Sequence, residues 1–221
     1  MTQSLSEYRE RYRREVIPEN YRGVAHLCFT FGTGLAVVVY CLLQLTRVQP
    51  LEWLTLPLTF LYANLAEYLG HRFAMHRPVR GLKILFERHA GQHHRFFSHR
   101  DMELETLRDL RVVLFPPVLM VFFVVVFAFP VGILLTWLFA ENVGFLFVAT
   151  AVAYFLNYEL FHLAYHMPAD SWFGRRRLVA VLRGLHTNHH DVRLMSRWNF
   201  NITYPICDAA FGSFYKTGGK S

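Results

Sequence analysis

Ten of the chain's twelve histidines fall into four closely spaced groups, and their spacing constrains the fold more than any other feature. Written as patterns, the groups are H-x4-H, H-x3-H-H, H-x3-H and H-x2-H-H. The residues are His71 and His76; His89, His93 and His94; His162 and His166; and His186, His189 and His190. Neutral imidazole is the commonest nitrogen ligand for iron, copper and zinc. Ten imidazoles are too many for one ion and suit two, so we predict that these distant groups meet around a pair of metal ions.

Four apolar stretches separate or flank the histidine groups. They cover residues 24–45, 51–69, 112–129 and 143–161. A membrane-spanning helix needs about 20 predominantly apolar residues, so each stretch is long enough to cross. Segment 131–140 could extend the third span past a kink at Pro130 or form part of a re-entrant hairpin. Because 53% of the residues are hydrophobic and 16% are aromatic, we predict an all-α integral membrane protein that forms a single domain over residues 1–221.

The basic residues indicate which ends of the spans share one side of the membrane. Four crossings put the tail 1–23, the stretch 70–111 and the region 162–221 on the same side, and these hold 5, 9 and 8 lysines and arginines. Only Arg47 lies in the opposite connections. Because cytoplasmic connections carry the excess of Lys and Arg, we predict that all four histidine groups face the cytoplasm. Topology and attraction to anionic headgroups explain the net charge of +7 without a nucleic-acid partner.

The cysteines and the N-terminal residues argue against other classes of protein. Cys28, Cys41 and Cys207 lack CxxC spacing, which disfavours an iron–sulfur cluster, a c-type haem or a thiolate metal site. The first 23 residues are charged rather than apolar, so we expect no cleavable signal peptide. A hydrolase is disfavoured because the sequence has no GxSxG elbow.

Ideal-helix geometry predicts which histidines share a helix face. His162 and His166 are four residues apart at the end of the fourth span, so one face carries both. By the same spacing His89 and His93 share a face, and His94 lies about 100° further round.

The first and last groups behave differently. His71 and His76 are five residues apart, which an ideal helix does not align, so we expect the second span to continue past the bilayer and loosen near His76. In the last group, His186, His189 and His190 fall within an arc of roughly 100°.

Metal-ligating histidines usually donate their other ring N–H to a carboxylate or a carbonyl. The nearby candidates for this role are Glu67, Glu159, Asp191, Asn157 and Asn188. His26 and His99 lie outside the histidine pattern, and we expect them at the membrane boundary and on the surface.

The histidine boxes resemble those of the fatty acid hydroxylase/sterol desaturase superfamily of integral-membrane di-iron proteins. The matching segments read HRFAMH, RHAGQHH, FHLAYH and GLHTNHH, followed by WNFNITYPICDAAFGSFY, which is similar to the family's closing segment. Each box is weak alone, but four in order, between suitable apolar stretches, are specific. The resemblance implies four membrane helices and a cytosolic helical cap, formed here by residues 70–111 and 162–221. The cap would hold a dinuclear metal site with the ten histidines as ligands and no catalytic residue beyond them.

The resemblance also implies the reaction, an oxygen-dependent oxidation of an unactivated C–H bond in a membrane lipid such as a fatty acyl chain or a sterol. Hydroxylation is the leading reaction and desaturation the alternative outcome. The implied cofactors are two iron ions with O2 as co-substrate, and purified protein can carry zinc instead, since zinc follows iron in affinity for such sites.

The partners and the location follow from the same resemblance. The sequence shows no cytochrome b5-like domain, so we expect a separate electron donor of the ferredoxin or cytochrome b5 type with its reductase. A chain of 221 residues suggests a bacterial inner-membrane protein, or a protein of the endoplasmic reticulum in a eukaryote.

Two other functions stay open at this stage. A membrane b-type haem electron carrier could use paired histidines, although it needs facing ligands on two spans rather than clusters with adjacent His–His pairs. A divalent-metal transporter would place its ligands midway through the bilayer, whereas these groups cluster at one edge. Aromatic residues along the spans could line an acyl tunnel, although ordinary helix packing is the favoured explanation for them; they are Phe60, Tyr62, Phe155 and Tyr158.

Overall fold

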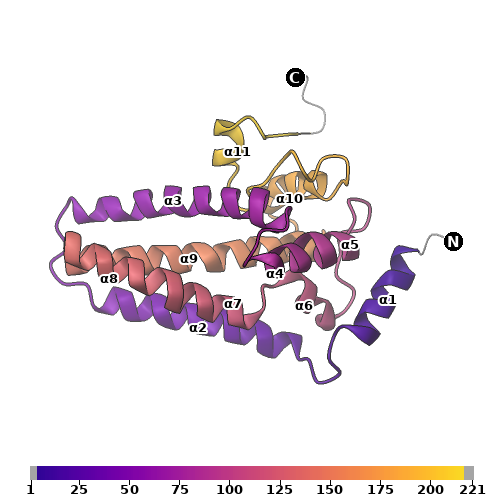
Figure 1. Cartoon of the computed structure of the whole chain (residues 1–221), viewed down its shortest axis with the longest axis horizontal. Coiled ribbons are helices and arrows are strands. Elements are labelled where there is room, and N and C mark those ends of the chain that lie inside the picture. Colours follow the sequence, from indigo (N-terminus) through magenta and orange to yellow (C-terminus); the bar gives the residue numbers. More distant parts are fainter. Residues whose placement is uncertain (1–3, 217–221) are drawn as a thin grey trace. The chain divides into compact units, whose positions relative to one another are not determined.

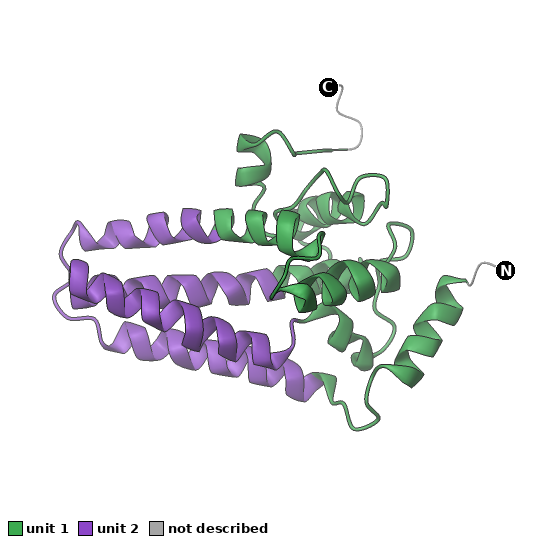
Figure 2. Ribbon diagram, in the orientation of Figure 1, with its two compact units in different colours: residues 1–23, 64–114, 160–221 green, residues 24–63, 115–159 purple. Residues whose placement is uncertain are grey.

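The computed structural model describes residues 4–216, which form helices, turns and loops without a β-sheet (Figure 1). This confirms the prediction of an all-α protein. The chain forms two compact units, each assembled from segments that are distant in sequence (Figure 2). Unit 1 comprises residues 1–23, 64–114 and 160–221, and unit 2 comprises residues 24–63 and 115–159. Whether both act as the predicted single domain stays a prediction.

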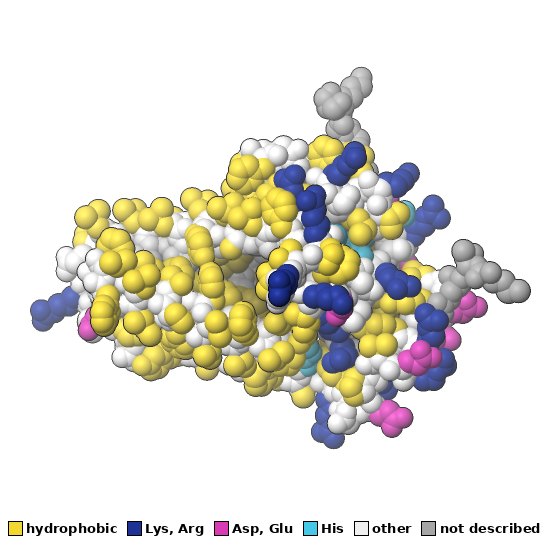
Figure 3. All heavy atoms as spheres, viewed as in Figure 1, with side chains coloured by type: hydrophobic (Ala, Val, Ile, Leu, Met, Phe, Trp, Pro, Cys, Tyr) yellow, Lys and Arg dark blue, Asp and Glu magenta, His cyan; other side chains and the backbone are white. Residues whose placement is uncertain are grey.

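Unit 2 consists of long apolar helices. They are α2 (Gly23–Leu43), the first half of α3 (Thr55–Leu69), α7 (Pro117–Phe122), the π-helical η5 (Phe123–Ala128), α8 (Phe129–Leu138) and most of α9 (Glu141–His166). Their common core includes Met120, Val148 and Val152. The outer faces are apolar as well, and hydrophobic side chains cover most of the visible face of unit 2 (Figure 3). Helices that are apolar on both the inner and the outer face are typical of a membrane environment.

Three helices are long and apolar enough to cross a membrane, namely Gly23–Leu43, Pro117–Leu138 and Glu141–His166. The first and last match the predicted stretches 24–45 and 143–161. The predicted stretch 112–129 is wrong at both ends. The helix begins at Pro117, because proline suits the first helical position, where no N–H partner is needed. It then continues through Pro130, directly after the π-helical turns of η5, so segment 131–138 extends the span and forms no re-entrant hairpin.

The second predicted span, 51–69, is only partly matched. Its α-helical part, α3, has 15 residues. A 3-10 turn, η1 (Glu52–Leu54), precedes α3, and the π-helical η2 (Gly70–Met75) continues it. The structure therefore supports three of the four predicted spans by length and composition. The loosening expected near His76 is present as η2.

The predicted span aromatics pack against other rings. Phe60 meets Tyr154 at a ring-centroid distance of 5.4 Å, and Phe155 stacks on Phe123 at 5.2 Å. Tyr62 lies parallel to Phe127 at 6.4 Å. Ordinary helix packing therefore accounts for these side chains.

Unit 1 is built from short helices joined by turns. They are α1 (Leu5–Glu15), η2, α4 (Lys83–Phe86), the π-helical η3 (Glu87–His93), α5 (His94–Phe96), η4 (Leu107–Asp109), α6 (Leu110–Val113), α10 (Arg177–His189) and α11 (Ile206–Ala210), with the C-terminal parts of α3 and α9. Its buried residues include large aromatic side chains such as Phe96, Phe97 and Phe200, and also all four histidine groups. Arginine and lysine side chains lie on its surface (Figure 3).

The helix α1 packs against the rest of unit 1 through aromatic and charged contacts. Ser4 and Glu7 cap its N-terminus reciprocally. Tyr12 packs edge-on against Phe96, with ring centroids 5.5 Å apart. Arg13 donates two hydrogen bonds, of 2.8 and 2.9 Å, to the carboxylate of the fully buried Asp109. The bidentate geometry makes this the strong form of an arginine–carboxylate pair.

This pair predicts a pH-dependent contribution to stability. Burial raises the pKa of Asp109, but hydrogen bonds from Arg13 and from the backbone N–H groups of Thr106 and Glu105 lower it more, so the pKa ends below its ordinary value. Folding thus favours the ionised carboxylate. Its contribution is complete above the ordinary carboxyl pKa of about 4 and is lost as the pH falls through the lower folded-state pKa.

We therefore expect Asp109→Asn to lower the Tm of detergent-solubilised protein at neutral pH, and this Tm difference to shrink below about pH 4. Thermal unfolding between neutral and acidic pH measures it, with the exposed Asp170 changed to Asn as the control. A difference that does not change with pH would contradict the ion-pair assignment.

A close helix approach in unit 2 gives a second prediction. A Cβ added at Gly144 of α9 would lie 2.0 Å from Thr136 Oγ1 and 2.6 Å from the carbonyl oxygen of Gly132, both on α8. Small residues allow such backbone approach between membrane helices. We expect Gly144→Ala to cost about 1–3 kcal/mol, seen as a lower Tm. Gly32→Ala is the matched control, because its Cβ meets no atom within 4 Å, and equal Tm values for the two variants would refute the close approach.

Candidate metal centre

Nine of the ten predicted histidines form two groups whose nitrogen atoms converge. The first group is His71, His76, His89, His94 and His189, and the second is His93, His166, His186 and His190. Within each group the candidate ligand atoms all lie within 4.8 Å of one another. All nine belong to unit 1, and all but the half-buried His76 are buried. Each group could hold one metal ion, whereas ligation itself stays a prediction.

The π-helical turns η2 and η3 determine which histidines of the first two boxes join which group. In a π-helix the i→i+5 hydrogen bonds place residues five apart above one another. His71 and His76, along η2, therefore join the same group, and so do His89 and His94, along η3. His89 and His93 lie with stacked rings 5.3 Å apart, in keeping with the predicted shared face, but they do not belong to the same group. His93 turns instead to the second group.

Helix α10 is a regular α-helix, and its histidines contribute to both groups. His186 and His190, four residues apart, lie in the second group, and His189 lies in the first. Their rings remain close, since the ring centroids of His189 and His190 are 6.4 Å apart. The two groups are therefore neighbours and share the last histidine box.

His162 lies beside the second group without belonging to it. Its Nε2 is 3.1 Å from Nε2 of His93, and its ring centroid is 5.0 Å from that of His186. His162 and His166 lie on the same helix, as predicted, with ring centroids 5.1 Å apart. Whether His162 is a tenth ligand stays a prediction.

Backbone carbonyls orient many of the rings. In the first group, the Nδ1 atoms of His71 and His189 donate to Phe200 O and Trp198 O. In the second group, the acceptors for His93, His166 and His190 are Val112 O, Met102 O and Phe97 O, at 3.1, 2.7 and 2.8 Å. A carbonyl only accepts hydrogen bonds, so each of these rings carries its proton on Nδ1 and leaves Nε2 bare.

The bare nitrogens face one another, and this observation tests whether metal ions suit the site. Nε2 of His93 lies 3.1 Å from Nε2 of His190, although both rings hold their protons on Nδ1. Two lone pairs at that distance cannot form a hydrogen bond to each other. A cation bound by both nitrogens resolves the conflict, so the donor set fits a metal that prefers imidazole.

Burial keeps the rings in the form that a metal requires. Burial and then neighbouring histidines lower the pKa of His89 and of His94 well below its ordinary value. Burial also lowers the pKa of His189 to about 4, against the opposing effect of its hydrogen bond to Trp198 O. These rings are therefore neutral at neutral pH, as metal ligands must be.

Three of the five polar residues predicted to hold the rings hydrogen-bond to other groups. Glu67 accepts hydrogen bonds from the backbone N–H and the hydroxyl of Thr203, at 2.9 and 2.6 Å. Asp191 pairs with Arg193, and Glu159 accepts from the backbone of Phe115 in unit 2. For Asn157 and Asn188 the prediction stays untested. The sequence predicted side-chain partners because every residue has a backbone carbonyl, so the sequence cannot show which carbonyl lies near a ring.

The carbonyls of the first group lie on a firmly held loop in the closing segment. The buried carboxylate of Asp208 accepts from the backbone N–H groups of Phe200 and Asn201, at 3.0 and 2.7 Å, and from the hydroxyl of Ser213. The sequence signal that could have indicated this loop is a carboxylate within an apolar stretch, because a buried acidic residue needs hydrogen-bond partners.

The remaining histidines lie apart from both groups. Nε2 of His26 is 2.9 Å from Phe115 O in unit 2. His99 is half-buried in the turn after the second box. Neither is a candidate ligand among the described residues.

Comparison with known proteins gives one match. The sequence model of a family described as fatty acid hydroxylase matches residues 56–213, which include all four histidine boxes. Neither the curated proteins nor the solved structures contain a match to this chain.

The division into two groups predicts separable metal losses. We expect His189→Ala to lower bound metal from about two ions per chain to about one by weakening the first group, and His190→Ala to do the same through the second group. His99→Ala should retain both ions. Elemental analysis after loading with zinc measures the stoichiometry, and unchanged metal in both ligand variants would contradict the grouping.

Proposed function

The chain belongs to the fatty acid hydroxylase family, and on that premise we propose that it is an oxygen-dependent di-iron enzyme that hydroxylates a C–H bond of a membrane lipid. The observation that carries the proposal is the pair of buried imidazole groups with bare nitrogens facing inward. Iron is favoured among the metals that imidazole suits, because the reaction is an oxidation and zinc has no redox chemistry. Bound iron would supply the activation of O2.

The protein's own residues prepare the site in two ways. The rings are buried from solvent, so they would hold iron in a place that bulk water does not reach, which favours oxidation of the lipid over side reactions with solvent. The carbonyl acceptors fix five of the rings before a metal arrives, which lowers the cost of ordering those ligands. We assign no catalytic residue beyond the histidines.

We propose that the chain crosses the membrane four times, with α3 as the additional span. The chain leaves unit 1 at Gly23 and returns to it at residue 64. If α2 crosses the bilayer, the chain must cross back between the end of α2 at Leu43 and the first histidine box. Residues 52–75 form continuous helical turns, which at about 1.5 Å per residue reach about 36 Å, enough for the hydrocarbon layer of roughly 30 Å.

The same topology supports the expected partners. Unit 1 carries the lysines and arginines that favour the cytoplasmic side. A separate electron donor of the ferredoxin or cytochrome b5 type, reduced by its reductase, would meet this basic surface, and complementary charge favours an acidic protein there. The lipid would come from the bilayer around unit 2.

The geometry disfavours the two alternative functions. A haem would have to lie between two ligating nitrogens, yet Nε2 of His93 is 3.1 Å from those of both His162 and His190, which leaves no room for a porphyrin. A transporter needs ligands midway along its spans, whereas His162 and His166 lie in the last turns of α9.

We expect cells that express the chain to contain a lipid that has gained one oxygen atom relative to cells without it. Comparative lipid mass spectrometry measures this, and the His93→Ala variant is the inactive control, since His93 belongs to the second group. A lipid that has lost two hydrogens would assign desaturation instead. A Soret band in the purified protein, or full lipid oxidation by His93→Ala, would contradict the proposal.

A further inference from the structure

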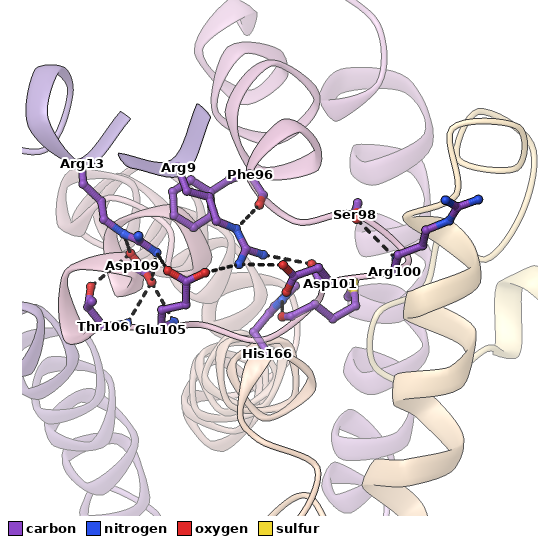
Figure 4. Close-up of polar contacts among 11 residues, drawn as sticks. Arg9, Arg13, Phe96, Ser98, Arg100, Asp101, Glu105, Thr106, Asp109 and His166 are labelled. Carbon is purple, nitrogen blue, oxygen red and sulfur yellow. Dashed lines mark hydrogen bonds and ion pairs between the residues drawn. The ribbon is translucent and has the colours of Figure 1, made fainter. Parts of the chain in front are cut away.

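A buried arginine links the N-terminal helix to the segment after the second histidine box. Arg9 on α1 is 1% exposed, and its guanidinium donates from Nε to Phe96 O at 2.8 Å and from Nη2 to Asp101 O at 3.0 Å (Figure 4). Its Nη1 pairs with Glu105 Oε1 at 2.7 Å and with Asp101 Oδ2 at 3.1 Å. All three guanidinium nitrogens are engaged, so Arg9 holds residues 96 and 101 at the same time.

The segment that Arg9 holds carries two of the carbonyls that orient histidine rings. Phe97 O accepts the ring hydrogen bond of His190, and Met102 O accepts that of His166. Each of these carbonyls lies one residue after a carbonyl that Arg9 binds. Between them the chain makes a tight turn closed by two backbone hydrogen bonds. Both rings belong to the second histidine group.

We propose that Arg9 is a positioning residue for the second histidine group, because it fixes residues 96–102 so that their carbonyls meet the rings of His166 and His190. The inference rests on the proposed metal centre. The carbonyls that hold the first group lie on residues 198 and 200, far from this segment in sequence. The effect of Arg9 through ring-orienting carbonyls is therefore expected in the second group.

The side chain suits this role by shape as well as by charge. The planar guanidinium presents donors in fixed directions, so it can bind two separate carbonyls and a carboxylate together. A lysine at position 9 keeps the positive charge that pairs with Glu105 and Asp101, but it lacks the fixed donor directions of the guanidinium. Position 9 lies outside residues 56–213, so the family match assigns it no role.

A competing explanation is that Arg9 only anchors α1 to unit 1. Arg13 separates the two explanations, because it lies on the same helix and pairs with Glu105 and Asp109. The carbonyl acceptors of the histidine rings lie on other residues. Both arginines anchor α1, and the Arg13 guanidinium also lies 5.3 Å from the centroid of the Phe96 ring. Of the two, however, only Arg9 hydrogen-bonds to backbone carbonyls of residues 96–102. Arg14 is the exposed control, and its ion pair is with its neighbour Glu15.

The first experiment measures how fast each metal is lost. Four arginine variants are each combined with His189→Ala, which leaves the second group intact, and with His190→Ala, which leaves the first group intact. They are Arg9→Met, Arg9→Lys, Arg13→Met and Arg14→Met. Each protein is loaded with zinc and challenged with a chelator. We expect both Arg9 variants to release zinc about 10–100-fold faster than the parent in the His189→Ala background, and at the parent rate in the His190→Ala background.

The outcomes separate positioning from general damage. Arg13→Met and Arg14→Met should match the parent in both backgrounds. Parent-like release by the Arg9 variants in the His189→Ala background overturns the proposal. Equal acceleration in both backgrounds also overturns it, since that would mean a general loss of structure. If Arg9→Met does not fold, the zinc release rate of Arg9→Lys tests the proposal by itself.

A second experiment does not depend on metal. Hydrogen exchange of the metal-free protein, read by mass spectrometry, reports on the backbone hydrogen bonds made by the amides of Ser98, Asp101 and Leu104. We expect faster exchange over residues 97–104 in Arg9→Met but not in Arg13→Met. Unchanged exchange overturns the role of Arg9. A wild-type chain that binds no zinc would contradict the proposed function instead, and the exchange result would still decide whether Arg9 holds this segment.

Discussion

Five of the nine rings in the candidate metal centre are oriented by the same interaction, the hydrogen bond from a ring Nδ1–H to a backbone carbonyl. This bond sets the tautomer of the ring and the direction of its bare nitrogen. The acceptors are the carbonyls of Phe97, Met102, Val112, Trp198 and Phe200. Because these lie on loops and short helical turns, the backbone of unit 1 sets the geometry of the site. Side chains such as Asp208 and Arg9 act one step further out, by holding that backbone.

The sequence was sufficient to predict which histidines meet but not how they divide. The spacing of His89, His93 and His94 has different outcomes in an α-helix and in a π-helix, and the pattern H-x3-H-H does not distinguish them. The five-residue spacing of His71 and His76 was the one local signal of non-ideal backbone, and it agreed with the structure. The acceptor carbonyls could not be predicted, because their positions depend on contacts between residues that are far apart in sequence.

The spans were predictable to a similar degree. Hydropathy located α2 and α9 within a few residues, because in both the apolar run and the helix nearly coincide. It failed for the helix Pro117–Leu138, where apolar residues 112–114 precede the proline that begins the helix. Hydropathy also gave no indication that α3 would begin only at Thr55, after the 3-10 turn Glu52–Leu54, or that the π-helical η2 would continue it past Leu69.

The two histidine groups have separate supports, which has a consequence for the pair. Asp208 steadies the loop behind the first group from the closing segment, whereas Arg9 reaches the segment behind the second group from α1. A substitution at one support can therefore change the affinity of one metal position and leave the other unaltered. A reaction that needs both metals is then limited by the weaker position. Arg9 of α1 would then matter to the activity as the histidine boxes do, although α1 contributes none of the candidate ligands.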